Sequence, residues 1–258
     1  MAYRWSVVSR GDGAGPNRGG SPRHPAATAI GMGRRPCSGA GRGSVVNPPR
    51  ERPGTVAPTE SPRAMNEDGG VSGEENQIVL SKQDLREVTA FAAACAEVVL
   101  EVFEADQPGD SRPREAVGAA WEFARGGERG KSLRDTAWAA LRAARGADTE
   151  AACEAARAAM SAAGAAYLHP LAKATQVKHI LGAGAHAARA AELVAGHDPG
   201  TGAEQVERAL RRATPVVVEV LERFPAAPEG GRRVGELIRM LDEGLRSLPP
   251  AGRLSASG

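Results

Sequence analysis

The sequence predicts an all-α protein, folded as a compact multi-helix bundle of about seven helices. Hydrophobic residues make up 41% of the 258 residues but aromatic residues only 3%, so the apolar content is mostly alanine, valine and leucine. Alanine is the best helix former, because its side chain loses no entropy in a helix. Apolar residues recur at spacings of three and four, and no segment shows convincing strand alternation. Small side chains and short loops favour close helix packing.

Seven segments carry the helical pattern, and a short loop follows each one except the last. The expected helices are residues 82–105, 112–125, 132–146, 149–169, 171–196, 202–224 and 232–247.

The first expected helix begins after Ser81, which is a preferred N-cap residue. Asp84 lies in its first turn, where a carboxylate interacts favourably with the helix dipole. A single apolar stripe follows the helical period along this segment. Its members are Leu85, Val88, Ala92, Cys95, Val99 and Val102.

The second expected helix is capped by Asp110 or Ser111. Pro113 lies in its first turn, where the missing N–H costs nothing, and Gly126 and Gly127 suit its C-terminal end.

The third expected helix begins at Ser132 and carries Trp138. We expect Trp138, like Trp121 and Phe123, to fill the core. If one of these aromatic residues lay exposed, it would mark a binding hot spot.

The later helices are interrupted by prolines. Pro170 interrupts the alanine-rich fourth helix or opens the fifth, and Pro215 predicts a kink or a break after Ala213. The last helix has an apolar stripe, which consists of Val234, Leu237, Ile238, Leu241 and Leu245.

Composition predicts three parts of the chain. We expect residues 1–80 to be a disordered Gly-, Pro- and Arg-rich segment, residues 81–248 to be the helical domain, and residues 249–258 to be a disordered tail. Met65 begins a stretch of different composition, so it is an alternative translation start. The competing interpretation of the prefix is a basic arm that binds nucleic acid.

Charge is unevenly distributed along the chain. Residues 1–64 hold ten arginines and three acidic residues, which is +7, so a whole-chain charge of +2 leaves −5 for residues 65–258. Nucleic-acid-binding domains usually carry a basic patch. Any such binding is therefore expected of the N-terminal segment.

The sequence predicts no cofactor, metal centre or membrane span. The three cysteines form no C-x-x-C pair, which fits buried thiols in a reducing cytoplasm. His179 and His186 are seven residues apart, roughly 10 Å along a helix, too far to bind one ion. No apolar run reaches eighteen residues, and no G-x-S-x-G motif occurs.

Residues 124–134, ARGGERGKSLR, superficially resemble a phosphate-binding loop. That loop requires G-x-x-x-x-G-K-[ST] after a strand, whereas Arg125 stands where the first glycine is needed and a helix precedes it. We therefore expect a helix–loop–helix connection, with Ser132 capping the next helix.

Asp110, Arg112 and Arg114 form the densest polar cluster in a loop. They are candidates for a partner-binding loop, because arginine makes bidentate contacts with carboxylates. The alternative is that Asp110 caps the helix and Arg114 pairs with nearby acidic residues.

Residues 95–127 contain Phe103-Glu104, the D-x-R-P-R linker at 110–114, Ala119 to Trp121, and Ala124-Arg125-Gly126. With these features the segment resembles the Imm-five-like domain of bacterial immunity proteins. It extends over roughly 82–248. The resemblance implies an all-helical domain that binds and blocks a cognate protein toxin, and it assigns no catalytic residue.

We therefore expect a cytoplasmic, non-enzymatic immunity protein whose acidic surface covers the active site of a basic toxin. The alternative is a DNA-associated protein that uses the Arg-rich prefix. Some relatives have a loose label linking them to the SbcC exonuclease, but this chain lacks the phosphate loop and long coiled coil of that enzyme. A third possibility is an enzyme with carboxylates or histidines in a bundle cleft. The oligomeric state is left open.

Overall fold

The computed structural model describes residues 77–248 of the chain. The predictions for residues 1–76 and 249–258, including the disordered segments, the start at Met65 and the basic arm, lie outside the described residues. Within residues 77–248 the fold is all-α, as predicted, with nine α-helices and one short 3-10 helix. Their bounds are α1 (Lys82–Glu97), α2 (Leu100–Asp106), α3 (Arg112–Ala124), α4 (Lys131–Gly146), α5 (Glu150–Ala165), η1 (Ala174–Gln176), α6 (Val177–Val194), α7 (Pro199–Leu210), α8 (Pro215–Glu222) and α9 (Arg232–Arg246).

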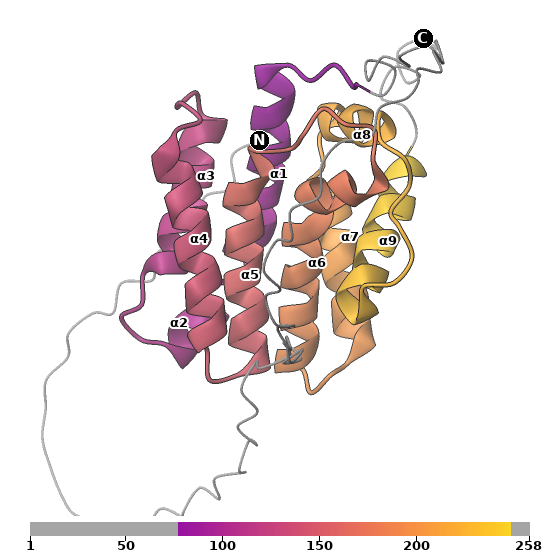
Figure 1. Cartoon of the computed structure of the whole chain (residues 1–258). Coiled ribbons are helices and arrows are strands. Elements are labelled where there is room, and N and C mark those ends of the chain that lie inside the picture. Colours follow the sequence, from indigo (N-terminus) through magenta and orange to yellow (C-terminus); the bar gives the residue numbers. More distant parts are fainter. Residues whose placement is uncertain (1–76, 249–258) are drawn as a thin grey trace, which may run out of the picture. The chain divides into compact units, whose positions relative to one another are not determined.

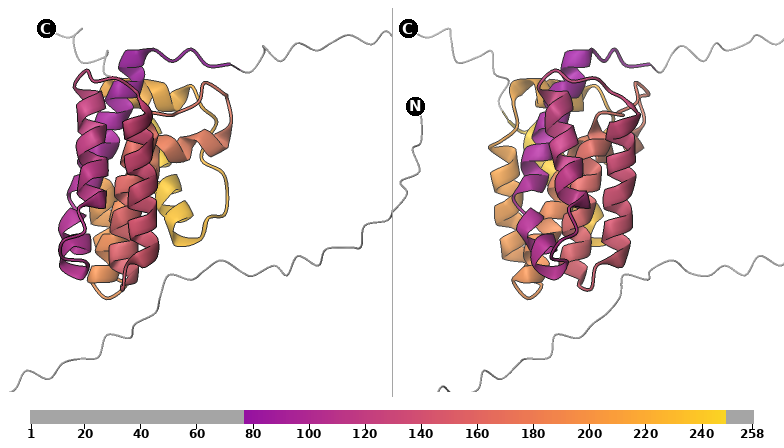
Figure 2. Two further views of the ribbon diagram at one scale, coloured as in Figure 1. Left: turned by 60° about the vertical axis from the view of Figure 1, so that its left-hand side comes forward. Right: turned by 90° about the vertical axis from the view of Figure 1, so that its left-hand side faces the viewer.

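Two long helices, α5 and α6, lie side by side at the centre of the described bundle (Figure 1). Helices α1, α3 and α4 pack against α5, and α1, α7 and α9 pack against α6. Figure 2 shows from two further directions that the long helices run alongside one another. The buried face of α5 is almost entirely alanine, and small side chains allow the backbones of neighbouring helices to approach closely.

The helix starts follow the sequence signals in part. Ser81 and Asp84 form a capping box at α1, in which each side chain accepts a hydrogen bond from the backbone N–H of the other residue at 3.0 Å. Ser132 does not cap α4, however. The N-cap is Gly130, which offers no side chain to the helix N–H groups.

The helix count exceeds the prediction because two expected helices are each divided. Residues 82–105 break at Val98 and Val99, where α1 ends and α2 begins. Leu100 and Phe103, which follow the break, are both buried, at 2% and 0% exposure. The segment 202–224 divides before Pro215, as its proline indicates.

A buried ion-pair cluster joins the C-terminal helix to the centre of the bundle. Glu192 of α6 is only 1% exposed. Arg233 of α9 donates to its Oε1 from Nε at 3.0 Å and from Nη2 at 2.6 Å, and Arg189 donates to its Oε2 at 3.0 Å. The hydrogen bond with Glu192 raises the pKa of Arg233 above its ordinary value. The two guanidinium groups therefore replace the water molecules that would solvate the carboxylate of Glu192 in the unfolded chain.

Gly202 of α7 lies directly against this cluster. An added Cβ would lie 2.0 Å from Oε1 and 2.6 Å from Cδ of Glu192, so alanine would force the carboxylate away from its arginines. We expect Gly202→Ala to lower the free energy of unfolding by about 1–3 kcal/mol despite the better helix propensity of alanine. Urea denaturation measures this change.

Gly118 of α3 provides the matched control, because nothing lies within 4 Å of an added Cβ there. Gly118→Ala should stabilise the protein by about 0.5–1 kcal/mol. Equal effects of the two substitutions would contradict the packing of Gly202 on Glu192.

Candidate functional site

The predicted loop residues Asp110 and Arg112 pair with each other. Asp110 lies just before α3 and accepts hydrogen bonds from the backbone N–H of Arg112 at 3.2 Å and from its Nε at 2.8 Å. The side-chain hydrogen bond from Arg112 holds the pKa of Asp110 below its ordinary value. The N-cap residue of α3, Ser111, makes no capping hydrogen bond with its side chain.

Arg114, the third residue of the predicted loop, lies in the first turn of α3 and joins that helix to α2. It makes a bidentate contact with Glu104, in which Nη2 donates to Oε2 at 2.7 Å. This contact lowers the pKa of Glu104. Both arginines thus lie in α3 and pair with a carboxylate of their own chain, and a role of Asp110, Arg112 and Arg114 in partner binding stays a prediction.

Trp138 of α4 is 56% exposed, so the expectation that it fills the core is wrong. The buried residues of α4 are Leu133, Ala140, Ala143 and Ala144, which define the opposite side of the helix. Trp138 lies on the polar side with its neighbours at the helical period. We call this surface the Trp138 face; it consists of Lys131, Arg134, Asp135, Trp138, Arg142 and Arg145.

The sequence contains the signal that places Trp138 at the surface. Lys131, Asp135, Trp138, Arg142 and Arg145 follow one another at intervals of four, three, four and three residues. That spacing forms one helical stripe, and four of its five members are charged. The aromatic side chain alone favours the core, whereas its charged neighbours at the helical period favour the surface.

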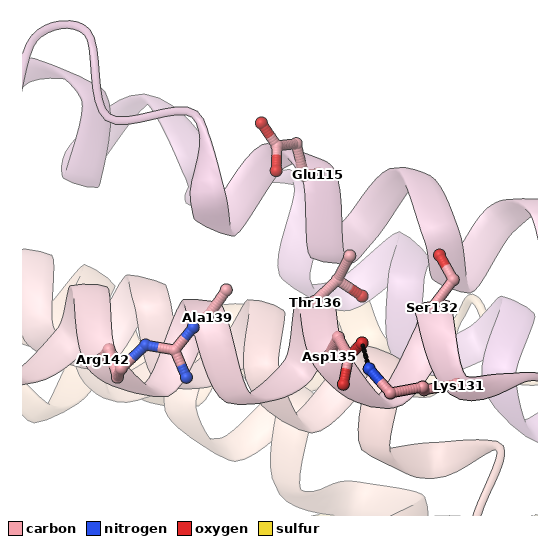
Figure 3. Close-up of a pocket in the computed structure, with 7 residues that line it drawn as sticks. All are labelled: Glu115, Lys131, Ser132, Asp135, Thr136, Ala139 and Arg142. Atoms are coloured by element: carbon pink, nitrogen blue, oxygen red, sulfur yellow. Dashed lines mark hydrogen bonds and ion pairs between the residues drawn. The ribbon is translucent and has the colours of Figure 1, made fainter.

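A shallow groove of about 460 Å³, open to solvent, lies between α3 and α4, and it overlaps the Trp138 face because Lys131, Asp135 and Arg142 line it. Figure 3 shows Glu115 on α3 and the other lining residues along α4. The α4 residues are Lys131, Ser132, Asp135, Thr136, Ala139 and Arg142. Three of these side chains, those of Ser132, Thr136 and Ala139, are small. Lys131 forms an ion pair with Asp135 at 2.5 Å within the groove.

Cation–π contacts hold the start of α4 against the end of α5. The guanidinium carbon of Arg134 lies 4.9 Å from the ring centroid of Tyr167, and that of Arg129 lies 5.7 Å from it. Tyr167 in turn donates a hydrogen bond from its hydroxyl to the carbonyl oxygen of Gly130 at 2.8 Å. These contacts fix the segment that resembles a phosphate loop as a connection between α3 and α4.

His186 and the buried carboxylate of Glu154 form a structural pair. Nδ1 of His186 donates to Oε2 of Glu154 at 2.6 Å, and Arg157 donates to the other oxygen at 2.8 Å. Burial alone would raise the pKa of Glu154, but His186 and Arg157 outweigh burial and lower it. Burial also lowers the pKa of His179. Across residues 77–248, no three histidine, cysteine or acidic side chains are grouped closely enough to hold a metal ion.

Glu154 gives the stability of the protein a defined pH dependence. Because its folded-state pKa lies below the ordinary value of 4.5, it stabilises the fold above that pH, and the contribution is lost as the pH falls. We expect Glu154→Gln to cost about 1–2 kcal/mol at pH 7 and less at pH 3.5. Urea denaturation at both pH values tests this, and a constant difference between the two proteins would contradict it.

The described cysteines are buried. Cys95 and Cys153 are both about 1% exposed, which confirms the sequence-based interpretation, and burial raises the pKa of Cys95 to about 12. Cys37 lies outside the described residues. In the described part of the chain, no helix is both long and apolar enough to span a membrane.

The fold and this surface define a class of protein: an all-helical bundle that exposes a tryptophan among charged residues beside a groove. The chain belongs to the Imm-5-like family, since the family model described as "Imm-5 like putative immunity protein" matches residues 79–214. The match covers α1 to α7 and ends before α8 and α9. No curated protein and no solved structure matches the chain.

Proposed function

We propose that this chain is a non-catalytic immunity protein that binds a cognate protein toxin and neutralises it. Membership of the Imm-5-like family supports the class of function. The observation that carries the proposal is the exposure of Trp138, because tryptophan and arginine dominate the binding energy of protein interfaces. Trp138 stands among arginines, beside the shallow groove of α3 and α4.

The proposed mechanism is occlusion. The toxin binds over the Trp138 face and the α3–α4 groove, and the bundle then covers the toxin's active site. Asp110, Arg112 and Arg114 lie at the start of α3, whose residue Glu115 lines the groove, so we include them in the proposed contact area. The role places the protein in the bacterial cytoplasm, where it protects the cell that makes the toxin.

Capture from a lysate of the host organism tests the proposal. The full chain is immobilised, the lysate is treated with nuclease, and co-eluting proteins are identified by mass spectrometry. The captured protein is then purified, and its toxic or enzymatic activity is measured with increasing amounts of this chain. Complete inhibition at a ratio of one to one is expected.

Two results would contradict the proposal: recovery of no stoichiometric protein partner, or a partner whose activity this chain leaves unchanged. The alternative of a DNA-associated protein depends on residues 1–64, outside the described range, and stays a prediction. Binding of DNA that disappears when these residues are removed would support it.

A further inference from the structure

Arginines without an ion pair are concentrated around α4. Residues 77–248 contain eighteen arginines, of which ten form ion pairs with described carboxylates. Four of the other eight lie between residues 129 and 145, a stretch of seventeen residues. They are Arg129, Arg134, Arg142 and Arg145. This stretch therefore holds half of these arginines in about a tenth of the described chain.

The Trp138 face has the opposite charge to the domain that carries it. Residues 77–248 contain 24 acidic and 22 basic residues, a net charge of −2. The Trp138 face has four cations and one carboxylate, Asp135, a net charge of +3. Glu115 across the groove reduces this only to +2. The average charge of residues 65–258 predicts an acidic contact surface, whereas the Trp138 face of α4 is basic.

We propose that the toxin surface that binds the Trp138 face is acidic and contains a pocket for the indole of Trp138. This inference rests on the proposed function. A basic toxin surface would place like charges opposite Arg142 and Arg145, whereas carboxylates would pair with both guanidinium groups. Trp138 lies between these arginines and Lys131 along the helix, so the apolar anchor is surrounded by charges that attract the partner.

The charge also predicts how the complex forms. Complementary charges at the rim of an interface accelerate association, and salt screens this effect. A buried aromatic anchor mainly slows dissociation instead. The inference therefore predicts that the arginines set the association rate and that Trp138 sets the dissociation rate.

The test compares two double variants of the full chain. Arg142→Glu/Arg145→Glu reverses the charge of the Trp138 face. The matched control is Arg208→Glu/Arg211→Glu on α7, which changes the net charge by the same amount. These two arginines are also exposed and have the same spacing of three residues. Binding to the toxin captured above is followed by biolayer interferometry between 50 mM and 500 mM NaCl.

We expect the α4 variant to associate about 10–100-fold more slowly at 50 mM NaCl and to lose most of its salt dependence. The α7 control should change the association rate less than about threefold. Equal slowing by both variants, or faster association of the α4 variant, would overturn the inference while leaving the proposed function intact. Failure to capture any toxin would overturn both.

Nucleic acid is the other polyanion that a basic, tryptophan-bearing face could bind. A fluorescently labelled single-stranded DNA 20-mer is therefore titrated with the wild type and the α4 variant, and anisotropy is recorded. Any binding by residues 1–64 is common to both proteins. Equal DNA binding supports a protein partner at the Trp138 face. A tenfold loss in the α4 variant, with unchanged toxin binding, would overturn the inference.

Discussion

Trp138→Ala is expected to weaken toxin binding by about 30-fold or more while leaving the thermal stability of the free protein unchanged. A central interface tryptophan typically contributes at least about 2 kcal/mol, which corresponds to about 30-fold in affinity. Trp138 is 56% exposed in the free chain, so its removal takes little from the core. Isothermal titration calorimetry with the purified toxin measures the first effect, and a melting curve measures the second.

Met240→Ala provides the control for this prediction. Met240 is a large apolar side chain of α9 that is 36% exposed, and it lies outside the proposed contact area. We expect its replacement to change the affinity by less than threefold. If both variants bound the toxin as well as the wild type does, Trp138 would not be an anchor of the interface.

Arg233→Ala is expected to lower the free energy of unfolding by about 3 kcal/mol. Glu192 would stay buried with Arg189 as its remaining cation, and an incompletely paired buried charge is strongly destabilising. Arg233 also joins α9 to α6, so the loss should loosen the C-terminal helix. Urea denaturation followed by circular dichroism measures the change.

Arg211→Ala serves as the control for Arg233→Ala. Arg211 is 67% exposed and lies 4.0 Å from Glu207, which is also exposed. Exposed ion pairs contribute little, so we expect a change within about 0.5 kcal/mol. Similar losses in both variants would show that the Glu192 cluster is not a special source of stability.

Local signals in the sequence predicted most of the fold. Ser81 and Asp84 predicted the start of α1, and Pro215 predicted the division between α7 and α8, because capping and proline effects act within a few residues. The break at Val98 was missed. Residues 95–102 contain neither proline nor glycine, so no local helix breaker marks the position of the break.

The candidate site was harder to predict than the fold. The stripe around Trp138 could have been recognised from spacing alone, but the groove depends on how α3 and α4 pack. The average charge of residues 65–258 suggested an acidic surface, because an average cannot show that unpaired arginines gather on one helix. The pairing of Glu192 with Arg233 spans 41 residues, and no local pattern indicates it.

The most direct test of the account is protection of living cells. The captured toxin is expressed from an inducible promoter in cells that also contain the wild-type chain, Trp138→Ala or the Met240→Ala control, each at the same soluble level. Growth should be restored by the wild type and Met240→Ala but not by Trp138→Ala. Equal protection by Trp138→Ala would contradict the claim that the Trp138 face neutralises the toxin.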